Sequence, residues 1–456
     1  MMLAGLALFA ARSVVQAELA RRGGEFLINT VRDGDLRQPH IAALPDGGFT
    51  VAWGSLDQIA ARRFDAATQP LGPEFQVNSR GTCYKIDPSL AAAADGSLLV
   101  AWCAVNALGD RFIDAQRLDA SVRPQGPNFI LADDFYVGPN LAAVNVAAVG
   151  DDQFVVAWTG YGGPGQPPII GQACLVGPSG QTPSFDLTSG VNQYNVAAAG
   201  KGDGSYQVVW YDGGGLIQGR PFQGAQPAAN MVEIGRVSSG LVNGPALCTQ
   251  DDGGFVVSWA TYGIDPYNVP VTYRRYDTSG APLAMPMPIT PEKPDALQVL
   301  PAVTCGPKDF TVAWKEGAGS SFPYATYRGR TFTPDALLPF SDFAVGIQRP
   351  AFSGAPSIGR LADGDLLLAW HDCGLESGCG IFGQRFTFAG TTDCPGDCRR
   401  DGTVTINELI LAVTIALDPQ QVASMKACLP ADVNLDYRVG VDELVLATGR
   451  ALGGCQ

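Results

Sequence analysis

The seven tryptophans of this 456-residue chain recur at a nearly constant interval. Successive tryptophans lie 49 to 56 residues apart, which indicates an internal repeat. A repeat of this length is one supersecondary unit that cannot bury its apolar face alone, so such units must stack on their neighbours. The tryptophans that set the register are Trp53, Trp102, Trp158, Trp210, Trp259, Trp314 and Trp370.

The residues that lead into each tryptophan are apolar and β-branched. Residues 49–53 read FTVAW, residues 154–158 read FVVAW and residues 310–314 read FTVAW. Alternate residues of a strand face opposite sides, and here both sides carry apolar or small side chains. We therefore predict a strand buried on both faces in the middle of each repeat. Packing between repeats explains the tryptophans without a ligand.

Turn residues divide each repeat into four strands. An Asp-Gly pair precedes the tryptophan strand at residues 46–47, 95–96, 203–204, 252–253 and 363–364. Its glycine supplies the positive φ of a tight hairpin. A third strand follows, as at residues 59–64, and a fourth is clear at residues 74–78. Four strands in each of seven repeats predict an all-β fold, a seven-bladed β-propeller.

The last repeat lacks an obvious fourth strand, whereas the chain carries an extra strand before its first repeat. Residues 25–29 read EFLIN, which matches EFQVN at residues 74–78. We predict that this N-terminal strand completes blade seven. The ring would then be closed and would leave no open edge.

The repeat resembles one common in large secreted bacterial proteins, in which a segment like DGGFVVAW is followed by one like IFGQRF. Residues 253–259 and 381–386 carry the resemblance best, and it covers about residues 25–388. It implies an architecture and no particular activity. We assign residues 1–22 to a signal peptide or leader, residues 23–390 to the propeller and residues 391–456 to a separate domain.

Two acidic loops of the calcium-binding type lie 35 residues apart in the C-terminal domain, at residues 397–408 and 432–443. Their spacing wraps side-chain oxygens and the carbonyl of position 7 around one point, and Ca²⁺ prefers about six to eight oxygens. We expect one or two Ca²⁺ ions. The candidate metal ligands are Asp397, Asp401, Thr403, Thr405 and Glu408 in the first loop and Asp432, Asn434, Asp436, Arg438 and Glu443 in the second.

A single amphipathic helix is predicted after each loop, at residues 408–417 and 443–452. This loop–helix pair is similar to a dockerin type I module, and the resemblance implies calcium-dependent folding and a cohesin-like partner. Arg399 at ligand position 3 of the first loop and Tyr437 at the turn position of the second depart from the pattern, which predicts weakened calcium binding. The alternative is a disulfide-held helical hairpin whose loops no longer bind metal.

Composition favours an extracellular protein. The net charge of −14 disfavours a nucleic-acid partner, and no segment after the N-terminus has the roughly 18 to 20 apolar residues of a membrane span. Residues 1–17 contain an apolar stretch ending in Val-Gln-Ala, which is compatible with a signal-peptidase site. Eleven cysteines fit an oxidising compartment. We expect a secreted or cell-surface protein, extracellular or periplasmic in a bacterium.

The cysteines are predicted to form disulfides. Cys373 and Cys379 flank a short loop and form the stronger candidate pair, and Cys83 with Cys103 is a weaker one. Because the number is odd, at least one thiol remains, for which Cys174 is a candidate. Four cysteines in the C-terminal domain allow three connectivities: Cys394, Cys398, Cys428 and Cys455.

The sequence contains no evident active site. His40 and His371 are the only two histidines, and neither has a partner at metal-ligand spacing. Acidic pairs such as Asp133 and Asp134 could serve a glycosidase, but most aspartates fall in turns. We favour a non-catalytic extracellular binding propeller with a calcium-stabilised docking module, whose protein or carbohydrate ligand is open. The alternative is a polysaccharide-active enzyme carrying a dockerin-like tail.

Overall fold

The computed structural model divides the chain into two compact units, Arg21–Phe386 and the remainder. Two helices and 31 strands lie in its described part. The structure describes residues 18–31, 36–55, 58–79, 88–105, 111–133, 144–161, 169–189, 192–237, 242–261, 268–289, 296–307, 309–318, 325–332, 343–349, 354–374, 378–389, 396–398, 403–417 and 439–453.

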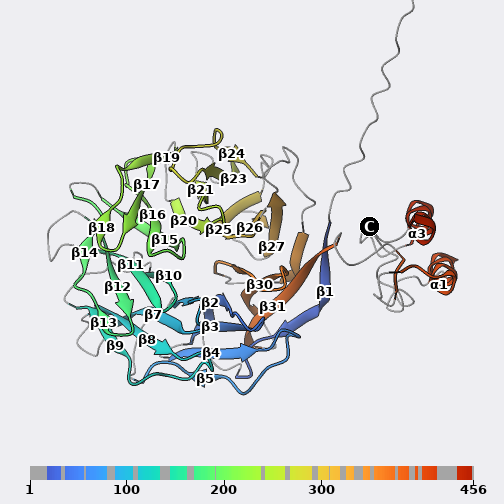
Figure 1. Ribbon diagram of the computed structural model, residues 1–456, viewed down its shortest axis with the longest axis horizontal. Coiled ribbons are helices and arrows are strands. Elements are labelled where there is room, and N and C mark those ends of the chain that lie inside the picture. The colour runs from blue at the N-terminus through green and yellow to red at the C-terminus, as the bar shows by residue number, and fades with distance from the viewer. Residues whose placement is uncertain are drawn as a thin grey trace, which may run out of the picture. The chain divides into compact units, whose positions relative to one another are not determined.

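Seven sheets stand side by side in a ring, as Figure 1 shows, so the predicted seven-bladed propeller is confirmed. Blade 1 contains β2 (Leu36–Ala43), β3 (Phe49–Ser55), β4 (Gln58–Phe64) and β5 (Phe75–Gln76). Blade 2 contains β6 (Ser89–Ala92), β7 (Leu98–Val105), β8 (Arg111–Leu118) and β9 (Phe129–Ala132). Blade 3 contains β10 (Val144–Gly150), β11 (Gln153–Tyr161), β12 (Ile169–Gly177), β13 (Gly180–Gln181) and β14 (Phe185–Asp186).

The remaining blades follow in chain order. Blade 4 contains β15 (Tyr194–Gly200), β16 (Ser205–Tyr211), β17 (Leu216–Gln223), β18 (Gln226–Pro227) and β19 (Val232–Arg236). Blade 5 contains β20 (Val242–Thr249), β21 (Phe255–Thr261), β23 (Val271–Tyr276) and β24 (Met287–Pro288). Blade 6 contains β22 (Asn268–Val269), β25 (Ala296–Cys305), β26 (Phe310–Ala318), β27 (Ala325–Phe332) and β28 (Phe343–Arg349). Blade 7 contains β29 (Ser357–Arg360), β30 (Leu366–Gly374), β31 (Gly378–Ala389) and β1 (Glu18–Leu27).

The tryptophan strands form the core of the blades, as predicted. Each tryptophan lies in the second strand of its blade and is at most 2% exposed. The small residue before it is also buried, as at Ala52 and Ala157. Large rings of one blade therefore pack against small side chains of the next, and clusters of apolar side chains fill the spaces between the blades.

The innermost strands are joined from blade to blade by side chains at one repeated position. Ser357 Oγ accepts a hydrogen bond from Ile41 N at 3.1 Å, and Ser89 Oγ accepts one from Val146 N at 2.9 Å. These bonds satisfy backbone donors on strand edges that have no further strand beside them. The bond from Ile41 N to Ser357 Oγ crosses from blade 7 to blade 1, so it contributes to the closure of the ring.

The N-terminal strand occupies the fourth-strand position of blade 7, which confirms the predicted closure. Strand β1 lies beside β31. Ile28 N donates to Ile381 O at 2.8 Å, and Ile381 N donates to Asn29 Oδ1 at 2.7 Å. Blade 1 repeats both bonds within itself, because Val77 N donates to Ile59 O and Ile59 N donates to Asn78 Oδ1, each at 2.7 Å.

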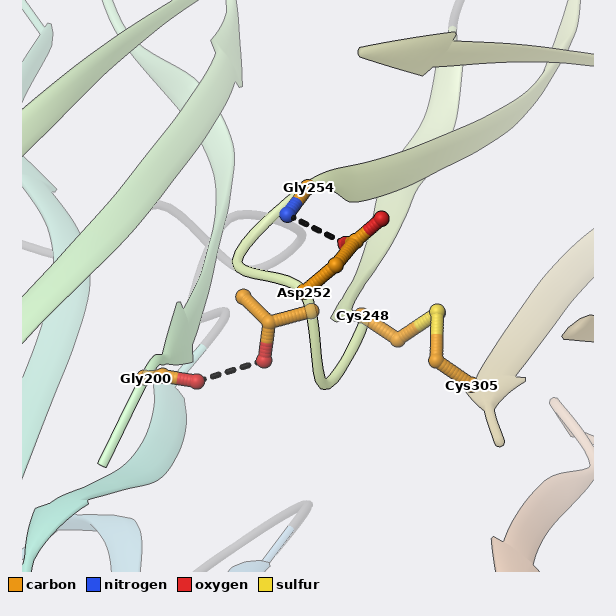
Figure 2. Close-up of a disulfide and its surroundings, with 6 residues drawn as sticks. Gly200, Cys248, Asp252, Gly254 and Cys305 are labelled. Carbon is orange, nitrogen blue, oxygen red and sulfur yellow. Dashed lines mark hydrogen bonds between the residues drawn. A yellow bond between two sulfur atoms is a disulfide. The ribbon is translucent and has the colours of Figure 1, made fainter. Parts of the chain in front are cut away.

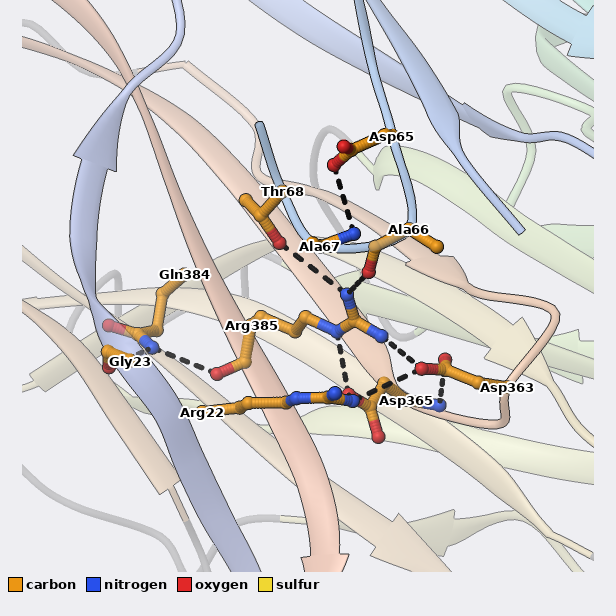
Figure 3. Close-up of polar contacts among 10 residues, drawn as sticks. All are labelled: Arg22, Gly23, Asp65, Ala66, Ala67, Thr68, Asp363, Asp365, Gln384 and Arg385. Atoms are coloured by element: carbon orange, nitrogen blue, oxygen red, sulfur yellow. Dashed lines mark hydrogen bonds and ion pairs between the residues drawn. The ribbon is translucent and has the colours of Figure 1, made fainter. Parts of the chain in front are cut away.

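A buried ion network reinforces this closure (Figure 3). Arg385 is 2% exposed, and its Nε donates to Asp365 Oδ2 at 2.6 Å. The same guanidinium contacts Asp363 of its own blade and the carbonyl of Ala66 in blade 1. Arg22 of β1 adds a second cation, with Nη1 2.8 Å from Asp365 Oδ2. The N-terminal strand, blade 7 and blade 1 are therefore joined by one network.

A disulfide that the sequence did not reveal joins blades 5 and 6 (Figure 2). It links Cys248 in β20 to Cys305 in β25, across a Cα–Cα distance of 5.6 Å. Cys379 is also disulfide-bonded, and the β30–β31 register places its backbone opposite that of Cys373, as the predicted pair requires.

Two cysteines in the described part of the propeller are thiols, and both bear on predictions made from the sequence. Cys103 is a buried thiol, so its predicted bridge to Cys83 is wrong. A strand in the middle of a blade points its side chains into the interblade core, and Cys103 packs there among apolar residues. Cys174 is a buried thiol, as predicted, and burial raises its pKa to about 12.

The C-terminal unit contains helices α1 (Ile406–Leu417) and α3 (Val441–Gly453), which contact each other. Both begin two residues before their predicted starts. Ala412, Ile415 and Val439 form the centre of a small apolar core. Within the described ranges, neither helix has the length and apolar character needed to cross a membrane.

We predict that Asn29→Ala lowers the free energy of unfolding by about 1–3 kcal/mol, because the buried Ile381 N–H loses its acceptor. Asn78→Ala is the matched control, since Asn78 makes the same bond to Ile59 inside blade 1. Urea denaturation should give similar losses for both variants. A loss for Asn78→Ala with none for Asn29→Ala would contradict closure by the N-terminal strand.

Candidate functional site

Four predicted ligands of the first candidate calcium loop lie within the residues that the structure describes. Asp397 and Glu408 are buried at 0% and 2% exposure, Thr405 is half-buried and Thr403 is exposed. The other predicted ligands lie outside the described residues: Asp401, Asp432, Asn434, Asp436, Arg438 and the side chain of Glu443. Arg399 and Tyr437 also lie outside them.

Glu408 has a structural role that the loop pattern did not reveal. Its Oε2 accepts hydrogen bonds from Thr405 N at 2.8 Å and from Thr405 Oγ1 at 2.7 Å. Thr405 is the N-cap of α1 and Glu408 is its third residue, so the pair forms a capping box. The Thr-x-x-Glu spacing before an apolar run was the available signal. The residue at loop position 12 thus also fixes the start of the helix.

The donor set of this loop fits calcium. Buried carboxylates are costly unless they are paired or bind a cation, and Asp397 and Glu408 are both buried within one short loop. Carboxylate, hydroxyl and carbonyl oxygens are the ligands that Ca²⁺ prefers. Among the side chains that the structure describes, no three His, Cys, Asp or Glu residues are grouped as a metal site.

The helices of the C-terminal unit each expose an apolar stripe, which we name the α1 stripe and the α3 stripe. The spacing of i, i+4, i+7 and i+11 puts such residues on one face of a helix. Corresponding members of the two stripes lie 35 residues apart, like the calcium loops. The α1 stripe contains Ile406, Ile410, Val413 and Leu417, which are 42% to 78% exposed, and the α3 stripe contains Val441, Val445 and Leu452, which are 65% to 86% exposed.

The α1 stripe lies opposite the buried side of its helix. Ala412 and Ile415 face the core of the unit, about half a turn away from Ile410. Helix packing inside the unit therefore does not use the stripe. Contiguous exposed apolar surface of this kind marks an interaction site more often than an ordinary surface.

Titratable side chains lie on both faces of β30 and on blade 6. The face of β30 that carries His371 packs on blade 1, with Leu367 and Ala369. The face that carries Asp372 packs on blade 6, where Trp370 contacts Tyr327. Lys315 and Tyr327 lie opposite each other on β26 and β27, and His371 and Asp372 are buried at the end of β30. Tyr327 Oη donates to Gly354 O at 3.2 Å, and Gly354 N donates to the His371 ring, 3.1 Å from Nδ1. All of these residues lie near the strand ends away from the Asp-Gly turns.

The surroundings of two of these side chains, His371 and Lys315, favour their neutral forms. An imidazole nitrogen that accepts a backbone N–H must be unprotonated, so His371 is held with an acceptor nitrogen. Burial lowers the pKa of Lys315, which favours its neutral amine. Sequence reasoning noted only His371 and Asp372, because Lys315 and Tyr327 come from another repeat, and Tyr327 contacts Trp370 and Gly354 only in the folded ring.

The other residues considered at the sequence level have separate environments. His40 lies on β2, opposite Ala52, and burial lowers its pKa to about 4. It occupies the repeat position of Ser89 and Ser357, which supports the structural interpretation. Asp133 is exposed at the end of β9, and Asp134 lies outside the described residues.

No protein-family model matches this chain, and no curated protein matches it. Similar solved structures include a protein of unknown function from Dyadobacter fermentans, with 10% identity, a TM-score of 0.47 and coverage of 81% of this chain and 99% of that one. An α-L-arabinanase from Penicillium chrysogenum, complexed with arabinobiose, has 12% identity, a TM-score of 0.45 and coverage of 80% and 98%. The Aleuria aurantia lectin has 14% identity, a TM-score of 0.44 and coverage of 71% and 97%. These sequence identities and TM-scores are too low to assign the function of any of these proteins to this chain.

We predict that His40 makes stability depend on pH. The unfolded chain binds a proton near pH 6.5 and the folded chain only near pH 4, so this contribution is full above 6.5 and is lost as pH falls to 4. The loss amounts to at most about 3 kcal/mol. The stability difference between wild type and His40→Gln, measured by urea denaturation, should therefore fall over that window. A difference that is constant from pH 7 to 4 would contradict it.

Proposed function

We propose that the protein is an extracellular, non-catalytic binding protein that is attached to a protein partner through its C-terminal unit. The observation that carries this proposal is the pair of apolar stripes on α1 and α3. The propeller is a rigid body whose repeated polar positions join its blades. The C-terminal unit instead exposes its largest apolar side chains, which suits it for attachment.

Attachment through the stripes is energetically reasonable. Burying one large aliphatic side chain stabilises a complex by about 1.5–3 kcal/mol, so one stripe of three or four such residues is a substantial docking surface. Few charged groups interrupt the stripes, so little desolvation opposes the burial. A cohesin-like partner with a flat apolar face is the proposed occupant, and the dockerin-like sequence pattern supports that choice.

Calcium is proposed to organise this docking surface. Glu408 is both a loop ligand candidate and the capping residue of α1, so an ion held by the loop would also fix where the helix begins. Asp397, at loop position 1, would bring the preceding chain to the same ion. The first residue of the α1 stripe, Ile406, lies between the capping residues. Calcium binding and stripe orientation are thus coupled through one short segment.

We predict that Ile410→Asp together with Val445→Asp weakens binding to a cohesin-type domain by at least about tenfold, because each places a charge within an apolar stripe. Titration calorimetry of the full chain would measure it, and excess chelator should weaken the wild type similarly. Thr414→Asp is the control, since Thr414 is exposed on α1 outside both the stripe and the calcium loop. Binding that is insensitive to both aspartates would overturn attachment through the stripes.

A second candidate function is polysaccharide cleavage, for which the buried His371 and Asp372 of β30 are the candidate residues. His371, Asp372 and Lys315 are proton-transfer groups of the kind that glycan hydrolysis needs. If they are catalytic, Asp372→Asn and His371→Gln should each abolish reducing-sugar release on a polysaccharide panel, with unchanged melting temperature. Release that persists in both variants would exclude this group as the catalytic centre.

A further inference from the structure

A groove of about 450 Å³ lies between blades 1 and 2 at the outer part of the ring. One wall is the segment that links β4 to β5, and the other is the turn that follows β8 in the next blade. Its volume is in the range of small-molecule sites. The residues that decide its chemistry are Arg63, Leu71, Phe75, Val122, Arg123 and Pro124.

The two walls are held in place by hydrogen bonds. Arg63 Nη1 donates to Ala120 O at 2.8 Å, which connects blade 1 to the turn of blade 2. Asp119 Oδ1 accepts from Ser121 N and Arg123 N, each at 2.9 Å, and so fixes that turn. Leu71 N donates to Arg63 O at 3.0 Å on the other side. The groove is thus formed before any ligand arrives.

Val122 lines the groove with an unfavourable backbone conformation. Its φ is 61°, in the left-handed region where a β-branched residue costs roughly 1–2 kcal/mol. Blade 5 places Gly280 at the corresponding turn position, with φ of 83°. The Val122 side chain is 4% exposed and forms part of the groove lining. Blade 1 places Thr68 at the same position, with φ of 66°, so the left-handed residue belongs to this turn of the repeat.

The lining combines apolar surface with positive charge. Leu71 is 57% exposed, and Phe75 is half-buried beside it on the same wall. Arg123 is exposed, and in the described part of the chain it has no ion pair with a carboxylate. Arg63 is paired with Asp46, so Arg123 is the cation with which this groove would meet an anionic ligand, in a chain whose net charge is −14.

We propose that this groove binds an acidic polysaccharide through its uronic-acid units. The C–H face of a sugar ring would pack on Leu71 and Phe75, and its carboxylate would accept charge-assisted hydrogen bonds from Arg123. Pro73 and Pro124 remove backbone donors from the walls, which disfavours an acidic peptide that needs main-chain partners. The proposal rests on the binding role of the propeller and names its ligand class; it is independent of the docking stripes.

The sequence carries a signal for this groove that its repeat pattern alone did not single out. Residues 70–73 read PLGP and residues 124–127 read PQGP, and these segments occupy the same position in adjacent blades. No other repeat has Pro-x-Gly-Pro there. The groove is therefore a feature of two particular blades and not of the repeat in general.

Calorimetric titration of the full chain with a defined oligogalacturonate tests the proposal. Arg123→Gln should weaken binding about tenfold or more, and added salt should weaken the wild type. Leu71→Ala should also weaken binding. Leu283→Ala is the matched control, because Leu283 is 53% exposed at the corresponding position of blade 5 and should leave binding unchanged.

Three results would overturn the proposal: no binding of oligogalacturonate, equal binding of a neutral oligosaccharide of the same length, or wild-type affinity in Arg123→Gln. Binding of poly-glutamate in place of the oligosaccharide, with the same loss in Arg123→Gln, would assign the groove to an acidic peptide and also overturn it. Cohesin-domain binding measured on the same samples separates this failure from that of the docking proposal, because the stripes lie in the other unit.

Discussion

The pairing of β1 with β31 is the contact on which the rest of the propeller depends. Every tryptophan strand is buried on both faces, so every blade needs a neighbour on each side. Only closure provides the last neighbour, and it joins segments about 350 residues apart in the chain. The N-terminal segment makes the same contact with the next blade as an ordinary fourth strand. Arg62 of blade 1 donates to Ile28 O at 2.9 Å, and Arg274 of blade 5 likewise donates to Ile234 O of blade 4.

Much of this fold could be predicted because it is periodic. The tryptophan register located the buried strands, and the match between residues 25–29 and 74–78 located the closing strand, down to the shared asparagine bond. The Cys248–Cys305 disulfide could not be predicted, since its partners lie on different inner strands whose separation only the ring defines. The contact of Tyr327 with Trp370 and the groove beside Arg123 were missed for the same reason: each is formed by residues of two blades.

The two units differ in what their repeated residues do. In the propeller, polar side chains at repeated positions join the blades, and the groove between blades 1 and 2 lies where these two blades depart from the repeat. The two Pro-x-Gly-Pro segments are this departure. In the C-terminal unit the repeat produces two similar exposed surfaces, because α1 and α3 carry matching apolar stripes 35 residues apart. Binding by the first unit and attachment by the second are the roles that we propose.

Closure by the N-terminal strand is the central claim, and hydrogen exchange measured by mass spectrometry tests it most directly. Amides of β1 that bond to β31 should be as protected as those of the interior strand β4, because both open only when the ring unfolds. We expect exchange of peptides covering Phe26–Asn29 to require hours and to follow the global stability. Exchange of those amides within seconds, with β4 still protected, would show that the ring is closed in some other way.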